Sequence, residues 1–156
     1  MTLDEIKAVT QPYTDKLKED FIIDRKIFAE ASGRANYNKT VREKIEKKVG
    51  VYIWLDDTRK EIIYIGKAGS IGRDGSYKKH SIQNRLTAPR GKNKATNKYI
   101  QTNDYVKAIM TEYDISHLSI VVIYSKEDEP PAYIEALLLY HFYKKNKRLP
   151  KLNNSF

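Results

Sequence analysis

Three short runs of apolar residues give the clearest structural signal in this chain. They are VYIWL, EIIYIG and LSIVVIY, and the first two flank the polar segment DDTRK. Short apolar runs bounded by turn residues are typical of strands, and two of them separated by a polar turn predict an antiparallel hairpin. The pattern therefore predicts a small, mainly antiparallel three-stranded sheet from residues 50–55, 61–66 and 118–124.

The first third of the chain shows helical spacing instead. Apolar residues recur at roughly helical intervals over residues 3–31, with an interruption near Pro12. Thr40 and Glu43 have the spacing of a capping box, which predicts a short helix from Thr40 to about residue 48. Residues 1–48 are therefore predicted to form an N-terminal helical extension. The pattern leaves open whether this extension packs on the core or reaches around a partner.

A predicted helix near the C-terminus carries an acidic residue in an apolar setting. The segment AYIEALLLY follows two prolines, and the residues one turn before and after Glu135 are all nonpolar. A carboxylate in an apolar stripe is costly unless it is paired or bound to a metal. Three explanations of Glu135 are open from the sequence: it binds a metal, it contacts water at the edge of the stripe, or it pairs with Arg85. With the sheet, these helices predict an α+β fold whose core spans residues 49–156.

Composition limits the classes of function. The chain has 156 residues, 29 of them basic and 20 acidic, for a net charge of +9, which favours a polyanionic partner. No apolar stretch approaches the ~20 residues that cross a bilayer, and the N-terminus lacks the apolar centre of a signal peptide. The absence of cysteine excludes disulfides and thiolate zinc sites. We therefore expect a cytoplasmic protein of one domain that does not contact a membrane.

The basic residues are concentrated in two stretches that lack acids. Between Lys78 and Lys98 the chain has seven Lys or Arg residues and no Asp or Glu. A single lysine is most simply part of a solvated surface, but two such stretches together favour a phosphate-binding groove. Tyrosines within the first stretch are available either to stack on bases or to pack. The residues predicted to bind DNA are Lys78, Lys79, His80, Arg90, Lys92, Lys94 and Lys98. The tyrosines are Tyr77, Tyr99 and Tyr105. The second stretch consists of Lys144, Lys145, Lys147, Arg148 and Lys151.

The order of five short motifs carries a family resemblance. Gly-Val-Tyr ending at Tyr52 precedes Tyr-Ile-Gly-Lys at 64–67, and then come Asn-Arg-Leu, Ile-Glu-Ala-Leu-Leu-Leu and Leu-Asn. Over about residues 50–154 the chain resembles the GIY-YIG nucleases. The resemblance implies hydrolysis of DNA phosphodiester bonds with a Mg²⁺ or Mn²⁺ ion bound by Glu135. It also implies that the catalytic residues are Tyr52, Tyr64, Arg85, Glu135 and Asn153, to which the chemistry of the site adds Lys67.

The chain departs from the family pattern at the arginine. Arg85 follows Gly66 by nineteen residues, whereas typical members place it within about ten. We interpret residues 69–79 as an insertion, which leaves Arg73 as the alternative catalytic arginine, and residues 89–103 as a second insertion. The Gly-rich segment after Gly66 matches neither common phosphate-binding loop, which argues against nucleotide binding. The three histidines lack zinc-ligand spacing.

The chemistry of the reaction suggests a role for each candidate. An ordinary phenol is a weak base at neutral pH because its pKa is about 10, and nearby cations favour its deprotonated form. Tyr64 is predicted to accept the proton of the attacking water, and Tyr52 is predicted to orient the water or the phosphate. Lys67, three residues after Tyr64, is predicted to lower the pKa of the Tyr64 phenol. Arg85 is suited to hold a nonbridging phosphate oxygen. Asn153, with Asn154 as the alternative, is expected to order the site.

These observations predict a stand-alone, metal-dependent DNA endonuclease. The compact layout resembles the restriction-endonuclease branch of the family, and a phage or mobile-element nuclease is the alternative within it. An enzyme of this size that cuts both strands is expected to act as a homodimer or by sequential nicking. A noncatalytic nucleic-acid-binding module is the alternative from another class of function.

Overall fold

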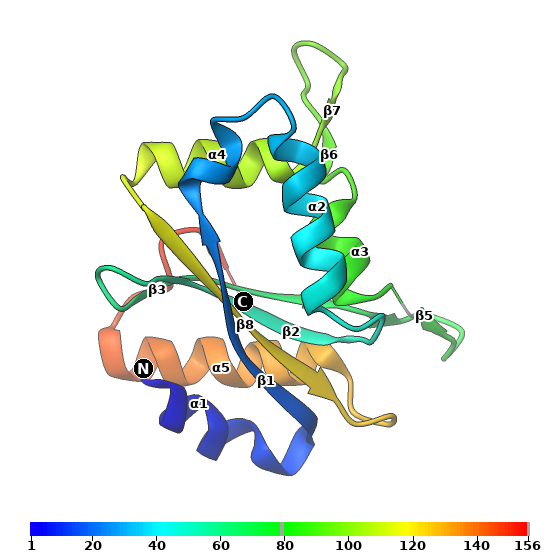
Figure 1. Ribbon diagram of the computed structural model, residues 1–156. Coiled ribbons are helices and arrows are strands. Elements are labelled where there is room, and N and C mark those ends of the chain that lie inside the picture. The colour runs from blue at the N-terminus through cyan, green and yellow to red at the C-terminus, as the bar shows by residue number, and fades with distance from the viewer. Residues whose placement is uncertain (79, 156) are drawn as a thin grey trace.

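A four-stranded antiparallel sheet forms the centre of the protein (Figure 1). The computed structural model describes residues 1–78 and 80–155, with the side chains of all of these except residues 18–20 and 77. Every neighbouring pair of strands in the sheet is antiparallel. The strands, in their order across the sheet, are β1 (Thr14–Asp24), β8 (His117–Ser125), β2 (Gly50–Asp56) and β3 (Glu61–Ala68). The predicted α+β class and the three predicted strands are confirmed.

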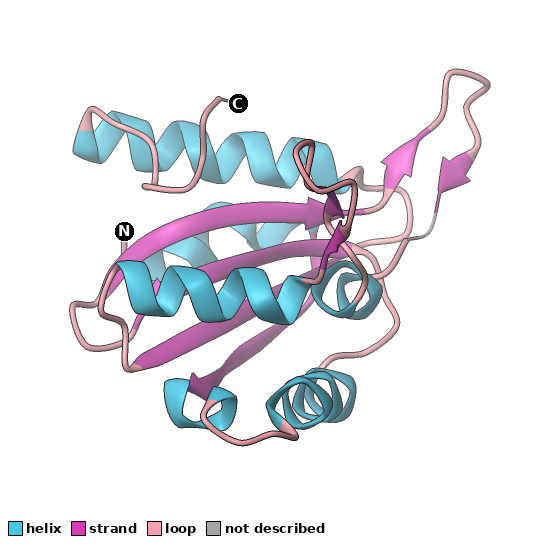
Figure 2. Ribbon diagram, turned by 90° about the horizontal axis from the view of Figure 1, so that it is seen from above, coloured by secondary structure: helices cyan, strands magenta, loops and turns pink. Residues whose placement is uncertain are grey.

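Helices cover both faces of this sheet (Figures 1 and 2). One face packs against α1 (Leu3–Thr10) and α5 (Pro131–Asn146). The other packs against α2 (Gly33–Lys44), α3 (Ile82–Thr87) and α4 (Thr102–Glu112). Two short 3-10 helices, η1 (Gln11–Tyr13) and η2 (Arg25–Phe28), flank β1. The sheet therefore lies between two hydrophobic cores, and alternate residues of each strand enter one or the other.

The prediction of helix over residues 3–31 is confirmed at the start by α1 but is wrong at the centre of that range. Residues 14–24 form β1, an edge strand paired with β8, so the N-terminal part of the chain supplies a strand to the central sheet. The strand has an irregularity between Lys18 and Phe21 that shifts its register. A bulge inserts an extra residue and breaks the alternation of a strand. Because of it, Leu17 packs against the core under α5 and Phe21 enters the opposite core, so the apolar residues of β1 do not alternate as in a regular strand.

The helix predicted to begin at Thr40 begins seven residues earlier. Thr40 lies inside α2, where its hydroxyl donates a hydrogen bond to the carbonyl of Asn36 at 2.9 Å. Tyr37 and Val41 are fully buried one turn apart, so tertiary packing defines this helix. At Gly33 an added Cβ would lie 2.6 Å from the carbonyl oxygen of Ile27. Glycine is therefore needed for the close approach of η2 to the start of α2.

The two segments interpreted as insertions each form a small hairpin. Residues 69–79 contain β4 (Ser70–Ile71) paired with β5 (Tyr77–Lys78), and residues 89–103 contain β6 (Gly91–Lys92) paired with β7 (Tyr99–Ile100). Both project from the body of the molecule, and the β6–β7 hairpin points upward in Figure 1. The chain thus adds two exposed ribbons on either side of α3.

Over the described ranges, 1–78 and 80–155, the longest apolar helical stretch is too short or too polar to cross a membrane.

Candidate active site and nucleic-acid interface

The pairing of β2 with β3 brings the two motif tyrosines together. Tyr52 lies directly opposite Gly66, and Tyr64 precedes Gly66 by two residues. An added Cβ at Gly66 would lie 2.5 and 2.8 Å from the Cε1 and Oη atoms of Tyr64, so the phenol ring lies over the glycine. The ring centroids of Tyr52 and Tyr64 are 5.8 Å apart. Gly66 is therefore the residue that allows the two phenols to approach.

The two phenols differ in their access to solvent. Tyr52 is fully buried, and its hydroxyl has no hydrogen-bond partner among the described residues. Burial, together with the neighbouring Tyr64 phenol, raises the pKa of Tyr52 far above its usual value, and the charges of Arg90 and Arg85 offset part of that rise. Tyr64 is only partly buried. Of the pair, Tyr64 is therefore the phenol that a water molecule can reach more easily.

An arginine lies within an aromatic cluster on the same face of the sheet. The guanidinium carbon of Arg90 is 4.2 Å from the ring centre of Tyr105, 5.7 Å from Trp54 and 5.8 Å from Tyr64. Arg90 was predicted as a DNA contact, but its half-buried side chain packs on these rings. A guanidinium over aromatic faces is attracted by their quadrupoles. Arg90 thus connects the base of the β6–β7 hairpin to the tyrosine pair.

Lys67 and Glu135 meet near the end of β3. The Nζ of Lys67 lies 3.7 Å from the Oε2 of Glu135, which projects from the first turns of α5. Ile65 belongs to the core beneath α5, and strand alternation directs Lys67 to that same side, away from the face that holds Tyr64. The expectation that Lys67 adjoins the Tyr64 phenol thus has no support in the geometry. Its ammonium partners the carboxylate instead.

The carboxyl of Glu135 carries an electrostatic penalty. Its side chain is 23% exposed, and burial raises its pKa above the usual value, while the charges of Lys67 and Arg85 act in the opposite direction. The positive charges of Lys67 and Arg85 therefore do not fully offset the cost of burying the ionised Glu135 carboxylate. A cation bound beside Glu135 would supply the missing charge, as the apolar neighbours of this residue suggest from the sequence.

The charge of Arg85 acts on both the tyrosine pair and the carboxylate. Arg85 is exposed on α3, whose first turn is capped by the Ser81 hydroxyl, and its charge lowers the pKa values of both Tyr52 and Glu135. Arg73, the alternative, lies in the exposed turn of the β4–β5 hairpin. The predicted positions thus form two pairs, Tyr52 with Tyr64 and Lys67 with Glu135, and the charge of Arg85 acts on a member of each.

The sixth position, Asn153, fixes the free edge of the sheet. Its side-chain amide donates to the carbonyl of Ile65 at 2.8 Å and its Oδ1 accepts from the Ile65 amide at 2.9 Å. The amide of Leu152 also donates to the carbonyl of Ile63 at 2.9 Å. The tail thus satisfies backbone groups that an edge strand would leave open, directly beside Tyr64. Asn154, by contrast, is exposed.

The first basic stretch keeps its charges unpaired. In the described part of the chain, no acidic side chain forms an ion pair with its lysines or arginines. Its exposed members are Lys78, His80, Arg85, Lys92, Lys94 and Lys98. Lys79 lies outside the described residues. The second stretch differs, because Lys145 pairs with Glu5 and both Arg148 and Lys151 pair with Glu61. Charge for binding phosphate is therefore available mainly in the first stretch.

Potential metal ligands are sparse. Among the described residues no group of three or more His, Cys, Asp or Glu side chains lies together. His80 and His141 are exposed, and His117 is exposed with its Nε2 3.8 Å from Asp24. A metal site at Glu135 would therefore rest on a single protein carboxylate, completed by water and phosphate oxygens.

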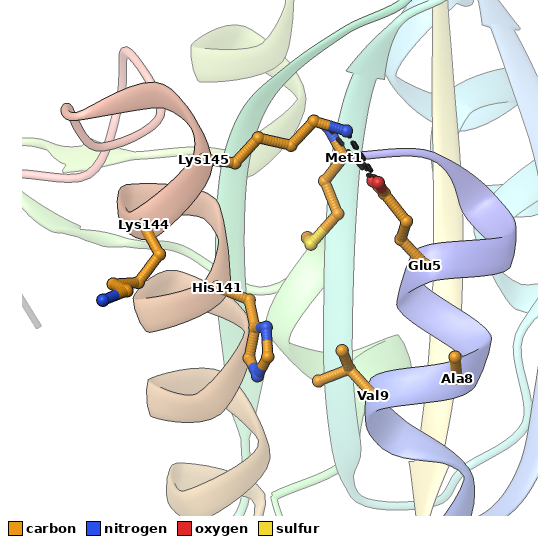
Figure 3. A pocket seen from close by; sticks show the side chains of 7 residues that line it. All are labelled: Met1, Glu5, Ala8, Val9, His141, Lys144 and Lys145. Carbon is orange, nitrogen blue, oxygen red and sulfur yellow. Dashed lines mark hydrogen bonds and ion pairs between the residues drawn. The ribbon is translucent and has the colours of Figure 1, made fainter.

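A hollow between α1 and α5 lies apart from these residues (Figure 3). In it the Nζ of Lys145 is 2.7 Å from the Glu5 carboxylate, so its main charges neutralise each other. The apolar parts of Met1 and Val9 also line it. It contains none of the predicted catalytic residues.

No protein-family model, curated protein or solved structure matches this chain. Sequence reasoning missed Trp54 and the contacts of Arg90 with Tyr64 and Tyr105. One signal was present, since Trp54 follows Tyr52 by two residues and therefore lies on the same face of its strand. The position of Arg90 depends on contacts that no local pattern encodes.

Proposed function

We propose that this protein is a divalent-metal-dependent DNA endonuclease of the GIY-YIG type. The observation that carries the proposal is that the rings of Tyr52 and Tyr64 pack together and that the charge of Arg85 acts on both Tyr52 and the half-buried carboxylate of Glu135. Hydrolysis of a phosphodiester needs a proton acceptor, positive charge at the phosphate and a metal-binding carboxylate. The arrangement supplies a candidate for each of these.

A divalent metal ion suits Glu135, whose negative charge is not fully offset by neighbouring positive charges. Mg²⁺ or Mn²⁺ takes oxygen ligands and retains several waters, so a single carboxylate with phosphate oxygens suits it. Glu135 is the residue proposed to hold the ion, and burial already disfavours its charge without one. When bound, the ion supplies positive charge to the phosphate as a Lewis acid.

The remaining residues act on water and phosphate. Tyr64 is proposed to accept the proton of the attacking water because it is the less buried phenol. Tyr52 packs against the Tyr64 ring and orients the water through it. Arg85 holds a nonbridging phosphate oxygen through its planar donors. Asn153 acts indirectly by fixing the backbone beside Tyr64.

The DNA-binding surface is proposed to be the first basic stretch with its two hairpins. Unpaired lysines bind phosphates by releasing counterions, and this contribution does not depend on sequence. Within the endonuclease class we propose a type II restriction role, with double-strand cuts made by a homodimer or by sequential nicking. The support is that both exposed hairpins, which carry unpaired lysines, belong to the core itself and lie on either side of α3.

Plasmid cleavage tests this proposal directly. Supercoiled plasmid is incubated with the protein in Mg²⁺, in Mn²⁺ and in EDTA, and nicked and linear products are measured. Cleavage is expected with either metal and absent in EDTA. Glu135→Gln should abolish cleavage while DNA binding in Ca²⁺, measured by fluorescence anisotropy, stays within about threefold of wild type, a small change on the affinity scale.

The matched control is Glu112→Gln, which removes an exposed carboxylate from α4 and should cut normally. Near-wild-type cutting by Glu135→Gln would contradict the metal assignment. DNA binding by the wild-type protein without cleavage in either metal would identify it instead as a noncatalytic binding module.

A further inference from the structure

The β6–β7 hairpin is a formed ribbon that projects from the protein (Figure 1). All ten residues from 91 to 100 are exposed. The turn is held by the Asn93 amide, which donates to the carbonyl of Lys98 at 2.8 Å, and by the Asn93 Oδ1, which accepts from Ala95 and Thr96 at 2.9 and 3.1 Å. The ribbon therefore has a defined shape although all of its residues are exposed.

Its side chains are suited to a nucleic acid. Three lysines lie on it, and the nearest acids in the sequence are Asp74 and Asp104. Tyr99 is 61% exposed, with the Nζ of Lys92 5.1 Å from its ring centre. An exposed aromatic ring with unpaired cations adds little to the stability of the fold, but it provides stacking and phosphate contacts to DNA.

The base of the ribbon is fixed to the tyrosine cluster. The amide of Arg90 donates to the carbonyl of Ile100 at 2.9 Å, which closes the ladder of the hairpin. The guanidinium of the same residue packs against Tyr105 and Tyr64. On the other side, Arg34 donates to the side chain of Gln101 at 2.9 Å. The direction of the ribbon is therefore coupled to the face of the sheet that holds Tyr64.

We propose that the β6–β7 hairpin enters the major groove of duplex DNA beside the phosphate that is cut, and that Arg90 is the positioning residue that orients it. This inference rests on the proposed nuclease function. A two-stranded ribbon fits the ~12 Å width of the major groove, whereas the ~6 Å minor groove is too narrow for it. Thr96 and Asn97 at the tip then face base edges, and Lys92, Lys94 and Lys98 face the phosphates.

The first test blocks the major groove. One duplex fragment is prepared with ordinary cytosine and again with glucosylated 5-hydroxymethylcytosine, whose sugar fills that groove. Binding is measured by anisotropy in EDTA, so that cleavage does not interfere. The wild-type affinity should fall about tenfold or more on the glucosylated fragment, the scale of losing base-edge contacts at one or two base pairs.

A shortened hairpin identifies the element responsible. Replacing residues 93–98 by Asn-Gly keeps the pair Lys92–Tyr99 and closes it with a two-residue turn. This variant should bind ordinary DNA more weakly and lose its sensitivity to glucosylation. The matched control replaces residues 72–76 by Asn-Gly in the β4–β5 hairpin. Its affinity for DNA should still fall on the glucosylated fragment. Wild-type indifference to glucosylation, or an exchange of these two results, overturns the inference.

Arg90 is tested by the single tryptophan. Trp54 lies 5.7 Å from Arg90, so DNA binding at the hairpin should change its fluorescence. Arg90→Met should abolish that change and the sensitivity to glucosylation, and Arg90→Lys should restore part of both. Full sensitivity in Arg90→Met overturns the positioning role.

The two proposals can fail separately. If the wild type cuts plasmid in Mg²⁺ yet is indifferent to glucosylation, the groove inference alone fails. If it neither binds nor cuts DNA, both fail.

Discussion

The two faces of the β2–β3 hairpin are built from alternate residues of the same strands, yet they differ in chemistry. Toward α5 the strands present Val51, Ile53 and Ile65, which pack with aliphatic side chains of that helix. Toward α3 and α4 they present Tyr52 and Trp54, which pack with further aromatic rings. The first face has the composition of a simple core. The second holds polar atoms that a core does not require.

The aromatic face tolerates defects that the aliphatic face avoids. The Oη of Tyr52 and the Nε1 of Trp54 are buried without a hydrogen-bond partner in the described part of the chain. Each such atom costs about 1–3 kcal/mol relative to a satisfied one. Local rules tend to be broken at functional sites and compensated elsewhere. The contrast therefore assigns stability to the aliphatic core under α5 and the tyrosine chemistry to the aromatic face, while the Lys67–Glu135 pair lies on the α5 side, outside that aliphatic core.

The largest expected effect concerns the arginine at the margin of the aromatic face. Arg85→Ala should lower single-turnover cleavage by roughly 10³-fold or more, the scale for an arginine at a transferred phosphoryl group. Arg73→Ala, which changes an exposed turn, should alter mainly DNA binding. Rates measured at saturating protein separate the two. The reverse pattern would show that the insertion lies on the other side of the catalytic arginine.

A change in the aliphatic core should affect stability and leave the chemistry intact. Leu138 is fully buried under the sheet, and Leu138→Ala should reduce the free energy of unfolding by about 2–5 kcal/mol. Urea denaturation measures this loss. The cleavage rate per folded molecule, at a temperature where the variant is folded, should stay near wild type. A large fall in that rate would mean that the two faces are not independent.

The tyrosine pair should show the opposite behaviour. Tyr64→Phe removes a hydroxyl and keeps the ring, so the variant should fold while single-turnover cleavage falls ~10²-fold, the usual scale for losing a general base. Tyr52→Phe removes a hydroxyl that is buried without a partner, so unfolding free energy should be unchanged or higher. Its cleavage rate should fall less. If Tyr52→Phe is the more damaging change, the two roles must be exchanged.

The sequence predicted the fold where the apolar pattern was regular. The strands at 50–55, 61–66 and 118–124 were found because short apolar runs bounded by polar turns are a local signal. The strand β1 was missed because its irregularity between Lys18 and Phe21 breaks the alternation of apolar and polar residues that indicates a strand. The helix α2 was misplaced because its weak helix formers depend on burial of Tyr37 and Val41.

The candidate site was predicted as a set of residues but not as an arrangement. Motif order named Tyr52, Tyr64, Arg85 and Glu135; in the structure the two phenols are in contact, and the charge of Arg85 acts on Tyr52 and on Glu135. The partner of Lys67 was wrong because strand alternation directs that side chain to the other face from Tyr64. The packing of Arg90 involves side chains from three elements, which residue spacing along the chain does not report.

The smallest expected effect tests whether the buried Glu135 carboxylate lowers the free energy of unfolding. Because burial raises its pKa, ionising Glu135 destabilises the fold, and this penalty develops as pH rises through the unfolded value of about 4.3 toward the raised folded one. In EDTA, Glu135→Gln should therefore be slightly more stable than wild type at pH 7 and equal to it below about pH 4. Glu61→Gln is the matched control, for which the change in stability at pH 7 should have the opposite sign.

Lys151 and Arg148 lower the pKa of Glu61, so its contribution to stability is present above the unfolded pKa and is lost as pH falls through the folded one. Glu61→Gln should accordingly be less stable than wild type at pH 7, with the difference vanishing in acid. Added Mg²⁺ should raise the melting temperature of the wild type but not of Glu135→Gln, because an ion that binds only the folded state stabilises it. A less stable Glu135→Gln at pH 7 in EDTA would mean that the ion pair with Lys67 outweighs burial, and the carboxylate would then be structural.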